Sequence, residues 1–532
     1  MPAAGIRPAA EPESGTREAL LWAHLRQTLA NEPDRDALVF DGGRYSYGDL
    51  AKQAEALAGA LWSSGVRPGD VVSYQLPNGR EAILVALAAL RIGAIANPII
   101  PIYRRKEVAF ILAQATPRVV FAPATHRQFA HAEMMRELAP ADCVIVTCGD
   151  RPGASPGFDE FVARGAGTNL AADDPSPDAD ALLLYTSGTE GDPKGVRHSQ
   201  RNLVLEARSV IEATAVTADD PIFMASPLTH ITGFMYGSVL SVVLRTKLCL
   251  MDGWAAEAAA DMIQRERCTW TAGATPFLQG LLDERLADRV ATLKTFRCGG
   301  ADVPPKVIRD AQARGMRAMR TYGCSEHPTI SGGVADDPLK AATTDGRVHP
   351  ANQVRIVDLA DETVVLPTGA IGEIQSKGPE VFLGYRDAGL DQKAFTADGW
   401  LRTGDIGRLD EDNYITVVGR KKDIIIRKGE NISAKEVEDV IIEMPDVAAV
   451  AIVGVPDAER GEMMVAACVP RPGATPTLAA IIRHLEAAGL ARQKFPERLE
   501  LLEALPTNSA GKIRKVELRR LFAAAETERI AS

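Results

Sequence analysis

A loop rich in small and hydroxyl-bearing residues is the part of this sequence best suited to chemistry. The apolar or aromatic residues 181–185 run into the string Thr186-Ser187-Gly188-Thr189-Glu190-Gly191-Asp192-Pro193-Lys194-Gly195. Small residues let backbone N–H groups approach an anion, the hydroxyl groups add donors, and the Lys194 ammonium adds a positive charge. The common P-loop instead places a glycine directly before Lys-Ser/Thr. The composition therefore fits either a phosphate-binding loop or an ordinary surface turn.

Two later turns combine glycine with polar side chains. A strand predicted over 293–298 enters Gly299-Gly300-Ala301, and residues 319–321 lead into Tyr322-Gly323-Cys324-Ser325-Glu326. Glycine allows the backbone to approach a ligand closely, and the Glu326 carboxylate offers the oxygen ligands that a hard cation prefers. Taken alone, Glu326 fits equally well a charge on the protein surface.

Four other polar positions fit either chemistry or ordinary structure. Asp405 follows Thr403-Gly404, and its ionised carboxylate is an acceptor suited to a diol, although this string is also typical of a turn. The cations Arg420-Lys421-Lys422 and the pair Gly511-Lys512 both fit solvated loops. His230 lies among apolar residues in the segment 227–234, and such a histidine is most often a hydrogen-bonded core residue.

The elements that must position these residues follow from hydrophobic spacing. Helices predicted over 81–92 and 104–114 alternate with strands over 71–75 and 119–121, which indicates a parallel sheet with helices on both faces. A Gly-Gly turn predicts a hairpin over 37–47, and Ser46 with Asp49 forms a capping box for the helix that follows. A small antiparallel β region is predicted over 372–374 and 378–385. Further strands are predicted over 414–418, 447–453 and 464–470, and further helices over 202–213, 434–443 and 478–488.

Size and composition exclude some classes of protein. A chain of 532 residues predicts two or three domains. The net charge of -10 argues against a nucleic-acid-binding protein, which needs a basic face. The cysteines number only 7 and lack paired spacing, which predicts reduced thiols and a cytoplasmic protein.

The N-terminal segment and the longest uncharged run do not indicate a membrane protein. Residues 1–16 are rich in Pro, Ala, Gly and Glu, so we expect disorder there and find no signal peptide. The longest uncharged run, 221–244, is interrupted by proline, glycine and polar residues. We interpret it as a buried strand end, a loop and a core helix rather than a membrane span.

The string from Tyr185 to Val196 closely resembles the nucleotide-binding signature of the adenylate-forming enzymes, which include acyl-CoA synthetases, amino-acid adenylation domains and luciferases. The resemblance continues in order along nearly the whole chain and looks closest to the acyl-CoA synthetases. It implies an α/β fold with a large N-terminal domain of parallel-rich sheets, a small β region and a small, mobile α+β C-terminal domain. The expected divisions are a domain over 17–420, a hinge over 421–423 and a second domain over 424–532.

The resemblance also assigns roles to individual residues. It implies that Lys512, Glu326, Lys194 and His230 act in catalysis, with Mg²⁺ on Glu326 and Thr189. Lys422 would be the hinge, and Gly429 would line a channel for CoA. The acyl pocket would contain His230, Thr232, Gly233, Phe234 and Cys324. ATP and AMP would bind at Thr186, Ser187, Gly188, Thr189, Gly299, Gly300, Ala301, Tyr322, Gly323, Ser325, Asp405, Val417 and Arg420.

The implied reaction has two steps. A substrate carboxylate attacks the α-phosphorus of ATP and releases pyrophosphate; after the small domain rotates about Lys422, the thiol of CoA attacks the acyl-adenylate and releases AMP. Relatives that activate amino acids carry an aspartate near His230 for the substrate ammonium, and here 221–244 holds no acidic residue. An α-amino acid is therefore disfavoured, and short- to medium-chain, alicyclic or aromatic acids are expected.

Two alternatives compete with a CoA ligase. One is an enzyme that loads the acyl group onto the pantetheine of a carrier protein. The other, of a different class, is an ATP-binding regulatory protein without catalysis, which predicts loss of Lys194, Glu326 or Lys512; all three are present. The sequence gives no indication of oligomeric state.

Overall fold

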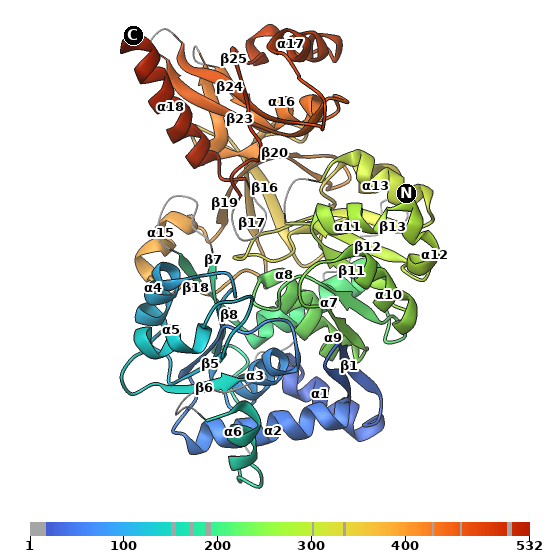
Figure 1. Cartoon of the computed structure of the whole chain (residues 1–532), viewed down its shortest axis with the longest axis vertical. Coiled ribbons are helices and arrows are strands. Elements are labelled where there is room, and N and C mark those ends of the chain that lie inside the picture. The colour runs from blue at the N-terminus through green and yellow to red at the C-terminus, as the bar shows by residue number, and fades with distance from the viewer. Residues whose placement is uncertain are drawn as a thin grey trace. The chain divides into compact units, whose positions relative to one another are not determined.

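A computed structural model describes residues 17–149, 156–170, 174–186, 193–300, 303–333, 337–427, 430–457, 460–507 and 513–531 (Figure 1). The segment 1–16, expected to be disordered, lies outside the described residues. The chain divides into two compact units. Of the described residues, the first unit comprises those within 17–186, 193–353 and 376–401, and the second comprises those within 354–375 and 402–531.

The first unit contains a seven-stranded sheet with the order β18-β8-β7-β4-β3-β5-β6. Strands β3 to β7 pair in parallel, whereas β8 returns antiparallel to β7 and β18 pairs antiparallel with β8. The parallel strands are almost fully buried, as expected for a sheet covered on both faces. Their bounds are β3 Val71–Tyr74, β4 Ile95–Pro98, β5 Val119–Pro123, β6 Val144–Cys148, β7 Asp180–Thr186, β8 Lys194–Ser199 and β18 Gly384–Tyr385.

A nine-stranded sheet, ordered β15-β14-β13-β12-β11-β9-β10-β1-β2, completes the first unit. Its central strands, from β13 to β1, are parallel, and antiparallel pairs close both edges. The strands are β1 Asp36–Phe40, β2 Gly43–Ser46, β9 Ile222–Met224, β10 Leu248–Leu250, β11 Trp270–Gly273, β12 Thr295–Gly299, β13 Arg317–Tyr322, β14 Ser331–Gly332 and β15 Arg347–Val348.

Helices cover both sheets of the first unit. The largest apolar cluster joins strands of the two sheets to helices α1, α2, α3, α7 and α9, and a second cluster joins the nine-stranded sheet to α10, α11 and α13, which lie beside β11–β13 in Figure 1. The helices are α1 Leu21–Asn31, α2 Tyr47–Ser63, α3 Arg80–Arg91, α4 Arg105–Ala115, α5 His131–Leu138, α6 Phe158–Arg164, α7 Gln200–Thr214, α8 Ile231–Gly233, the π-helical turn η2 Phe234–Val239, α9 Leu240–Leu244, α10 Ala256–Glu266, α11 Thr275–Leu281, α12 Ala287–Val290, α13 Pro305–Ala313, α14 Pro338–Thr343 and α15 Asp391–Ala394.

Local sequence rules account for several of these elements. The hairpin β1–β2 and the helix α2 that follows it confirm the predictions for 37–63, and the Ser46 hydroxyl and the Asp49 carboxylate form the expected reciprocal capping box. The uncharged run 221–244 forms β9, a loop and the buried helical run α8–η2–α9, also as predicted. No helix among the described residues is long and apolar enough to cross a membrane.

The second unit contains two smaller sheets. One has the order β16-β17-β19-β20, and the other has β22-β21-β24-β23 with β25 paired to β24. Along β23, Val450 and Ile452 face α16 and α17, whereas Ala451 and Val453 face α18, which is the period-two alternation of a strand covered on both faces. The elements are β16 Gln353–Val357, β17 Gly372–Lys377, β19 Leu401–Leu409, β20 Ile415–Arg420, β21 Ile424–Arg427, β22 Glu430–Ser433, β23 Val447–Asp457, β24 Gly461–Pro470, β25 Arg498–Leu501, α16 Ala434–Ile441, α17 Leu478–Ala487 and α18 Lys515–Ala531.

Two sequence-based expectations differ from these groupings in detail. The segment 378–385 was expected to join a small β region, but its strand β18 extends the seven-stranded sheet, because Tyr385 pairs with Val196 of β8. The four-stranded sheet groups with the C-terminal part of the chain instead of the large domain, since α16 packs on β20 and the Ser433 hydroxyl donates to the Val418 carbonyl. The hinge expected over 421–423 stays a prediction.

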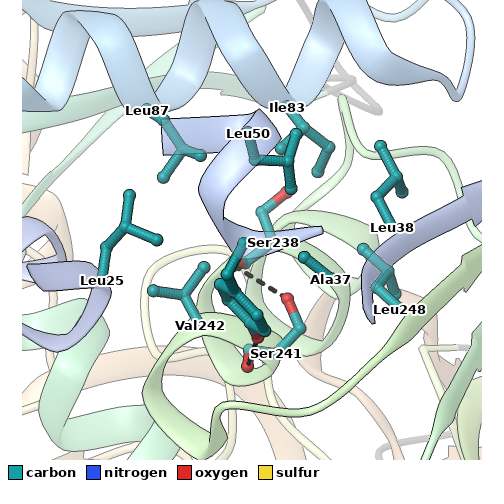
Figure 2. Close-up of a pocket in the computed structure, with 11 residues that line it drawn as sticks. Leu25, Ala37, Leu38, Leu50, Ile83, Leu87, Ser238, Ser241, Val242 and Leu248 are labelled. Atoms are coloured by element: carbon teal, nitrogen blue, oxygen red, sulfur yellow. Dashed lines mark hydrogen bonds between the residues drawn. The ribbon is translucent and has the colours of Figure 1, made fainter. Parts of the chain in front are cut away.

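A small cavity in the first unit has an apolar lining. It is lined mainly by leucine, isoleucine and valine side chains from helices α1, α2, α3 and α9 and strands β1 and β10 (Figure 2). Its polar neighbours satisfy one another, since the Ser241 hydroxyl donates to the Ser238 carbonyl. None of the site residues expected from the sequence lines this cavity, so it is a packing feature of the core.

Candidate functional site

Lys194 begins the strand that returns from the glycine-rich loop. Thr186 at the end of β7 and Lys194 at the start of β8 are register partners, so a hairpin closes the loop between them. The Lys194 side chain is exposed, and its ammonium lies 5.4 Å from the centroid of the Tyr385 ring. Ser187, Gly188 and Thr189 lie outside the described residues.

Glu326 lies close to this strand and is held from two sides. The Tyr385 hydroxyl donates to Glu326 Oε1 at 2.7 Å, and the backbone N–H of Phe382 donates to the Glu326 carbonyl at 2.8 Å. The preceding residue, Ser325, has its carbonyl 2.8 Å from Nε2 of His198 on β8. Two residues predicted for the site, Lys194 and Glu326, therefore share the neighbour Tyr385.

His198 is a neutral, structural histidine at this junction. Its side chain is fully buried, and burial lowers its pKa to about 4. A neutral imidazole carries one N–H, and donation from Nε2 to the Ser325 carbonyl places that proton on Nε2. This bond ties strand β8 to the turn that carries Ser325 and Glu326.

The glycines expected to bind ATP and AMP lie where the backbone disfavours a side chain, either for lack of room or because φ is positive. Gly299 at the end of β12 pairs with Thr321 of β13, and a Cβ at Gly299 would lie 2.5 Å from the Thr321 carbonyl oxygen. At Gly323 a Cβ would lie 2.1 Å from the Pro328 carbonyl oxygen, and Gly300 has a φ of +79°. Tyr322 is 9% exposed at the end of β13, and Ala301 lies outside the described residues.

The segment expected to form the acyl pocket begins a short helix. His230 is the N-cap of α8, and its Nδ1 accepts a hydrogen bond from the Thr232 N–H at 3.3 Å. A Cβ on Gly233 would lie 2.1 Å from the Pro227 carbonyl oxygen. Phe234 is 1% exposed and packs in the largest apolar cluster, whereas Cys324 is partly buried. His230 thus has a structural hydrogen bond on one nitrogen; its place in an acyl pocket stays a prediction.

A buried group of polar residues near these elements escaped the sequence analysis. The carboxyl groups of Glu206 on α7 and Glu380 are each 1% exposed, and Glu380 accepts from the Ser209 hydroxyl and from Asn352 Nδ2, the latter at 2.9 Å. Burial, reinforced for Glu206 by the neighbouring Glu380, raises the pKa of both carboxyl groups, so the pair retains a proton. His327, 3.9 Å from Glu380, is neutral because burial lowers its pKa to about 3. No spacing rule connects these residues, since Glu206 and Glu380 come from distant segments.

In the second unit, Asp405 and Arg420 form an ion pair. They are register partners on β19 and β20, with Arg420 Nε 3.1 Å from Asp405 Oδ1. Asp405 is 5% exposed, and Val417 lies on β20 opposite Gly407. The Asp405 carboxylate therefore has a cationic neighbour that is predicted for the same ATP and AMP site.

The turn that carries Lys422 is held by two ion pairs. The Lys421 ammonium lies 2.7 Å from Oε2 of Glu373, which is 2% exposed on β17, and Arg519 of α18 lies 2.6 Å from Oδ1 of Asp423. Arg519 also donates to the Lys422 carbonyl at 3.2 Å. Gly429 and Lys512 lie outside the described residues.

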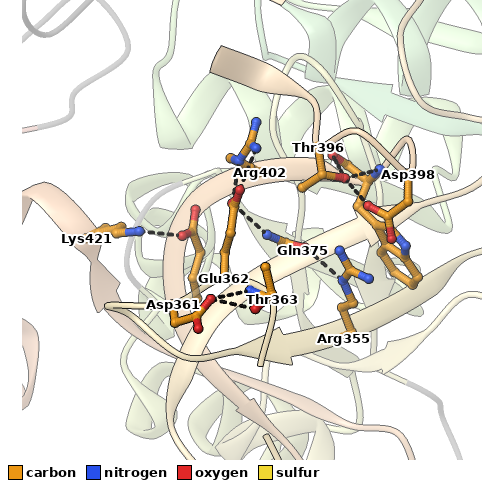
Figure 3. Close-up of polar contacts among 11 residues, drawn as sticks. Arg355, Asp361, Glu362, Thr363, Gln375, Thr396, Asp398, Arg402 and Lys421 are labelled. Atoms are coloured by element: carbon orange, nitrogen blue, oxygen red, sulfur yellow. Dashed lines mark hydrogen bonds and ion pairs between the residues drawn. The ribbon is translucent and has the colours of Figure 1, made fainter. Parts of the chain in front are cut away.

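A second polar chain in this unit braces the four-stranded sheet (Figure 3). Arg402 pairs with Glu362 through Nε at 2.6 Å, and Gln375 donates to the same carboxylate at 3.4 Å. Gln375 in turn accepts from Arg355 Nε at 2.8 Å. These contacts fix β16, β17 and the start of β19, from which Asp405 projects.

The residues present fit a Mg²⁺ ion that is held largely by its substrate. The described residues hold no group of three or more His, Cys, Asp or Glu side chains able to ligate a metal. Mg²⁺ is commonly held by one or two carboxylates together with substrate phosphates and water. Glu326 supplies one such carboxylate, and its Oε1 accepts a hydrogen bond from the Tyr385 hydroxyl.

Comparison with known proteins agrees with this arrangement. A family model described as AMP-binding enzyme matches residues 25–386, and a model of the C-terminal domain of AMP-binding enzymes matches residues 436–512. The chain is 33% identical over 522 residues to a medium-chain fatty-acid–CoA ligase of Escherichia coli K12, covering 94% of this chain and 90% of that protein. It is also 33% identical over 497 residues to an indoleacetate–CoA ligase of Aromatoleum aromaticum, covering 92% and 96%.

The fold matches a solved structure over nearly its full length. The ATP-bound MatB protein of Rhodopseudomonas palustris is similar with a TM-score of 0.86 and 29% identity, covering 95% of this chain and 99% of that one. The two family models together match most of the chain, in the order that the sequence motifs predict. The chain therefore belongs to the family of AMP-binding enzymes.

Proposed function

We propose that this protein is an AMP-forming acid–CoA ligase, which activates a carboxylic acid as its acyl-adenylate and transfers the acyl group to the thiol of CoA. The observation that carries the proposal is the convergence of Lys194 and Glu326 on Tyr385. In that arrangement a cation at the start of β8 and a carboxylate from a separate turn contact the same tyrosine. The named relatives, which include ligases for medium-chain fatty acids and indoleacetate, support the reaction class.

The chemistry explains why ATP is needed. A carboxylate is a poor electrophile, and a mixed anhydride with AMP supplies a good leaving group. The substrate carboxylate forms a bond to the α-phosphorus as the bond to pyrophosphate breaks, so two anions must approach while charge builds on phosphate oxygens. Catalysis is then mainly positioning and compensation of negative charge.

Each predicted residue has a part in this account. Lys194 and the hydroxyl groups of Thr186, Ser187 and Thr189 bind the outgoing phosphates, and Lys512 lies between the carboxylate and the α-phosphate. Glu326, and by prediction the Thr189 hydroxyl, would hold Mg²⁺, which would supply positive charge for the phosphate oxygens. Tyr322, Gly299, Gly300 and Gly323 bind the adenine, whereas Asp405 accepts hydrogen bonds from the ribose and Arg420 assists it.

The second step transfers the acyl group. The CoA thiol gives up its proton, its sulfur forms the new thioester bond, and the bond from the acyl carbon to the AMP oxygen breaks. Movement of the C-terminal domain about Lys422 would take Lys512 away and bring the segment around Gly429 to the substrate. Hinge residues that absorb a change in backbone angles are a common device for such a movement.

The acid itself is proposed by class. The run 221–244 contains no acidic residue that would pair with a substrate ammonium, which disfavours α-amino acids. Among the relatives, acids of both aliphatic and aromatic type are named. We therefore propose an acyl group without an α-ammonium, of short- to medium-chain, alicyclic or aromatic type.

The test is a screen for AMP release over a panel of such acids, with ATP and Mg²⁺, in the presence and absence of CoA. AMP release that requires both an acid and CoA supports the ligase. AMP release that requires a pantetheine-loaded carrier protein and does not respond to free CoA would replace it with the carrier-loading alternative. The lack of any acid-dependent exchange of pyrophosphate into ATP would contradict acyl-adenylation as a whole.

A further inference from the structure

Tyr385 touches two charged residues of the proposed ATP site and was not among the residues expected there. It lies on β18, whose pairing with β8 is extended by backbone hydrogen bonds from Leu383 to Arg197, at 2.8 Å, and from Arg386 to Gly195, at 2.7 Å. Because Tyr385 pairs with Val196, and Lys194 is two residues before Val196, the three side chains lie on one face of the sheet. The ring therefore reaches Lys194 as a diagonal neighbour.

The Tyr385 ring is held rigidly. It is 6% exposed, lies 4.9 Å from the Phe382 ring at 71° in an edge-to-face contact, and belongs to a small apolar cluster with Val196 and Leu401. Its backbone N–H donates to Asp391 Oδ1 at 2.8 Å. Aromatic pairs in this geometry fix ring orientation, so the hydroxyl points in a defined direction.

The hydroxyl is the donor in its bond to Glu326. An ionised carboxylate can only accept hydrogen bonds, so the Tyr385 hydroxyl, 2.7 Å from Glu326 Oε1, supplies the proton of this bond. A carboxylate that is hydrogen-bonded through one oxygen has its plane and its second oxygen oriented. Outer contacts of this kind commonly set the orientation of a metal-binding carboxylate.

The same ring acts on Lys194 by a second contact. The ammonium lies 5.4 Å from the ring centroid, within the range in which a cation is attracted to the face of an aromatic ring. Phe382, three residues before Tyr385, adds a backbone bond to the Glu326 carbonyl. One short segment, 382–385, thus contacts both the carboxylate and the lysine.

We propose that Tyr385 is a positioning residue that sets the Glu326 carboxylate for Mg²⁺ and holds Lys194 beside it for the phosphates of ATP. This inference rests on the proposed function only for the identity of the ligand, Mg²⁺ with ATP. It assigns two separable parts to one side chain: the hydroxyl acts through Glu326, and the ring acts through Lys194.

The experiment measures ATP binding by calorimetry, once with increasing Mg²⁺ and once in EDTA. Tyr385→Phe removes the hydroxyl and keeps the ring; we expect the Mg²⁺ concentration for half-maximal binding to rise about ten- to a hundredfold, the scale for losing such an outer contact. The affinity of Tyr385→Phe for ATP in EDTA should equal that of the wild type. Tyr385→Leu should show the same Mg²⁺ defect and, in addition, about two- to fivefold weaker binding in EDTA, because the contact with Lys194 is lost.

The matched control is Tyr45→Phe, which removes a hydroxyl from a tyrosine stacked on Phe40 in the β1–β2 hairpin. It should bind ATP as the wild type does, and near-ultraviolet circular dichroism should confirm that all variants are folded. The proposal would be overturned if ATP binding to Tyr385→Phe had the wild-type dependence on Mg²⁺, or if this variant lost as much ATP affinity in EDTA as in Mg²⁺. It would also be overturned if ATP binding to the wild type did not depend on Mg²⁺. If the wild type binds Mg²⁺ and ATP but activates no acid, the proposed function fails while the role of Tyr385 stands.

Discussion

Arg420 Nε lies 3.1 Å from Asp405 Oδ1, and the two residues face each other across β19 and β20. The pair joins a 5% exposed carboxylate to a cation on the neighbouring strand. An ionised carboxylate with a fixed orientation accepts hydrogen bonds well from the two hydroxyl groups of a ribose. The structure thus gives the proposed ribose contact a rigid, charged partner.

The substitution Asp405→Asn tests this contact. We expect the KM for ATP to rise about ten- to a hundredfold, since a hydrogen bond to a charged group contributes roughly 1.5–3 kcal/mol. The control Asp219→Asn changes the same group at a carboxylate that is 95% exposed, and it should leave KM unchanged. An Asp405→Asn enzyme with wild-type KM for ATP, and with its fold intact by circular dichroism, would remove Asp405 from the nucleotide site.

Lys512→Ala tests whether Lys512 acts in adenylation and not in thioester formation. Removing a preorganised positive charge should slow adenylation by about two to four powers of ten. Thioester formation from a supplied acyl-adenylate should continue at the wild-type rate, because the α-phosphate is already bonded to the acyl group. Single-turnover assays measure the rate of each step. The control is Lys306→Ala, which removes an exposed lysine that pairs with Asp310. Equal loss in both steps would show that Lys512 has another role.

Lys422→Pro should give the opposite pattern. Proline fixes φ near −65° and would block rotation at this position. Adenylation should persist while CoA-dependent turnover falls. Lys422→Ala removes the same side chain and keeps the backbone free, so it should retain both steps. Wild-type CoA-dependent turnover in Lys422→Pro would place the hinge elsewhere.

The burial of His198 predicts how the free energy of unfolding depends on pH. The pKa of His198 falls from the ordinary value of 6.5 to about 4 through burial, so the unfolded chain binds the proton more readily than the folded one. The contribution of neutral His198 to the free energy of unfolding is fully present above pH 6.5 and is lost as the pH falls from 6.5 towards 4. The slope should be about 1.4 kcal/mol per pH unit for one histidine. Urea unfolding of the wild type and of His198→Gln across this range measures it, and the variant should show the smaller slope. Identical slopes would contradict the assignment of His198 as a neutral buried group.

Much of the fold and part of the site follow from local signals. The Ser46 capping box and the helical run after His230 are short-range patterns, and the structure confirms both. The need for glycine at Gly323 is also local, because a Cβ there would meet the Pro328 carbonyl oxygen, whereas at Gly299 it would meet Thr321 of the neighbouring strand.

Contacts between distant segments were beyond sequence reasoning. Tyr385 contacts Lys194 and Glu326 because β18 pairs with the edge of a sheet whose other strands lie much earlier in the sequence. The carboxyl pair Glu206 and Glu380 likewise joins α7 to a later segment, and no periodicity relates them. Pairing of strand edges and burial of charged pairs depend on tertiary packing, which a single sequence does not specify.

The central claim is that a carboxylate oxygen of the substrate attacks the α-phosphorus of ATP. An acid identified by the AMP-release screen, labelled with oxygen-18 in its carboxylate, tests this directly when the products are examined by mass spectrometry after one turnover with CoA. The account predicts one labelled oxygen in AMP and none in pyrophosphate, because the acyl carbon–oxygen bond breaks in the second step. Unlabelled AMP, or label in a released phosphate, would contradict it.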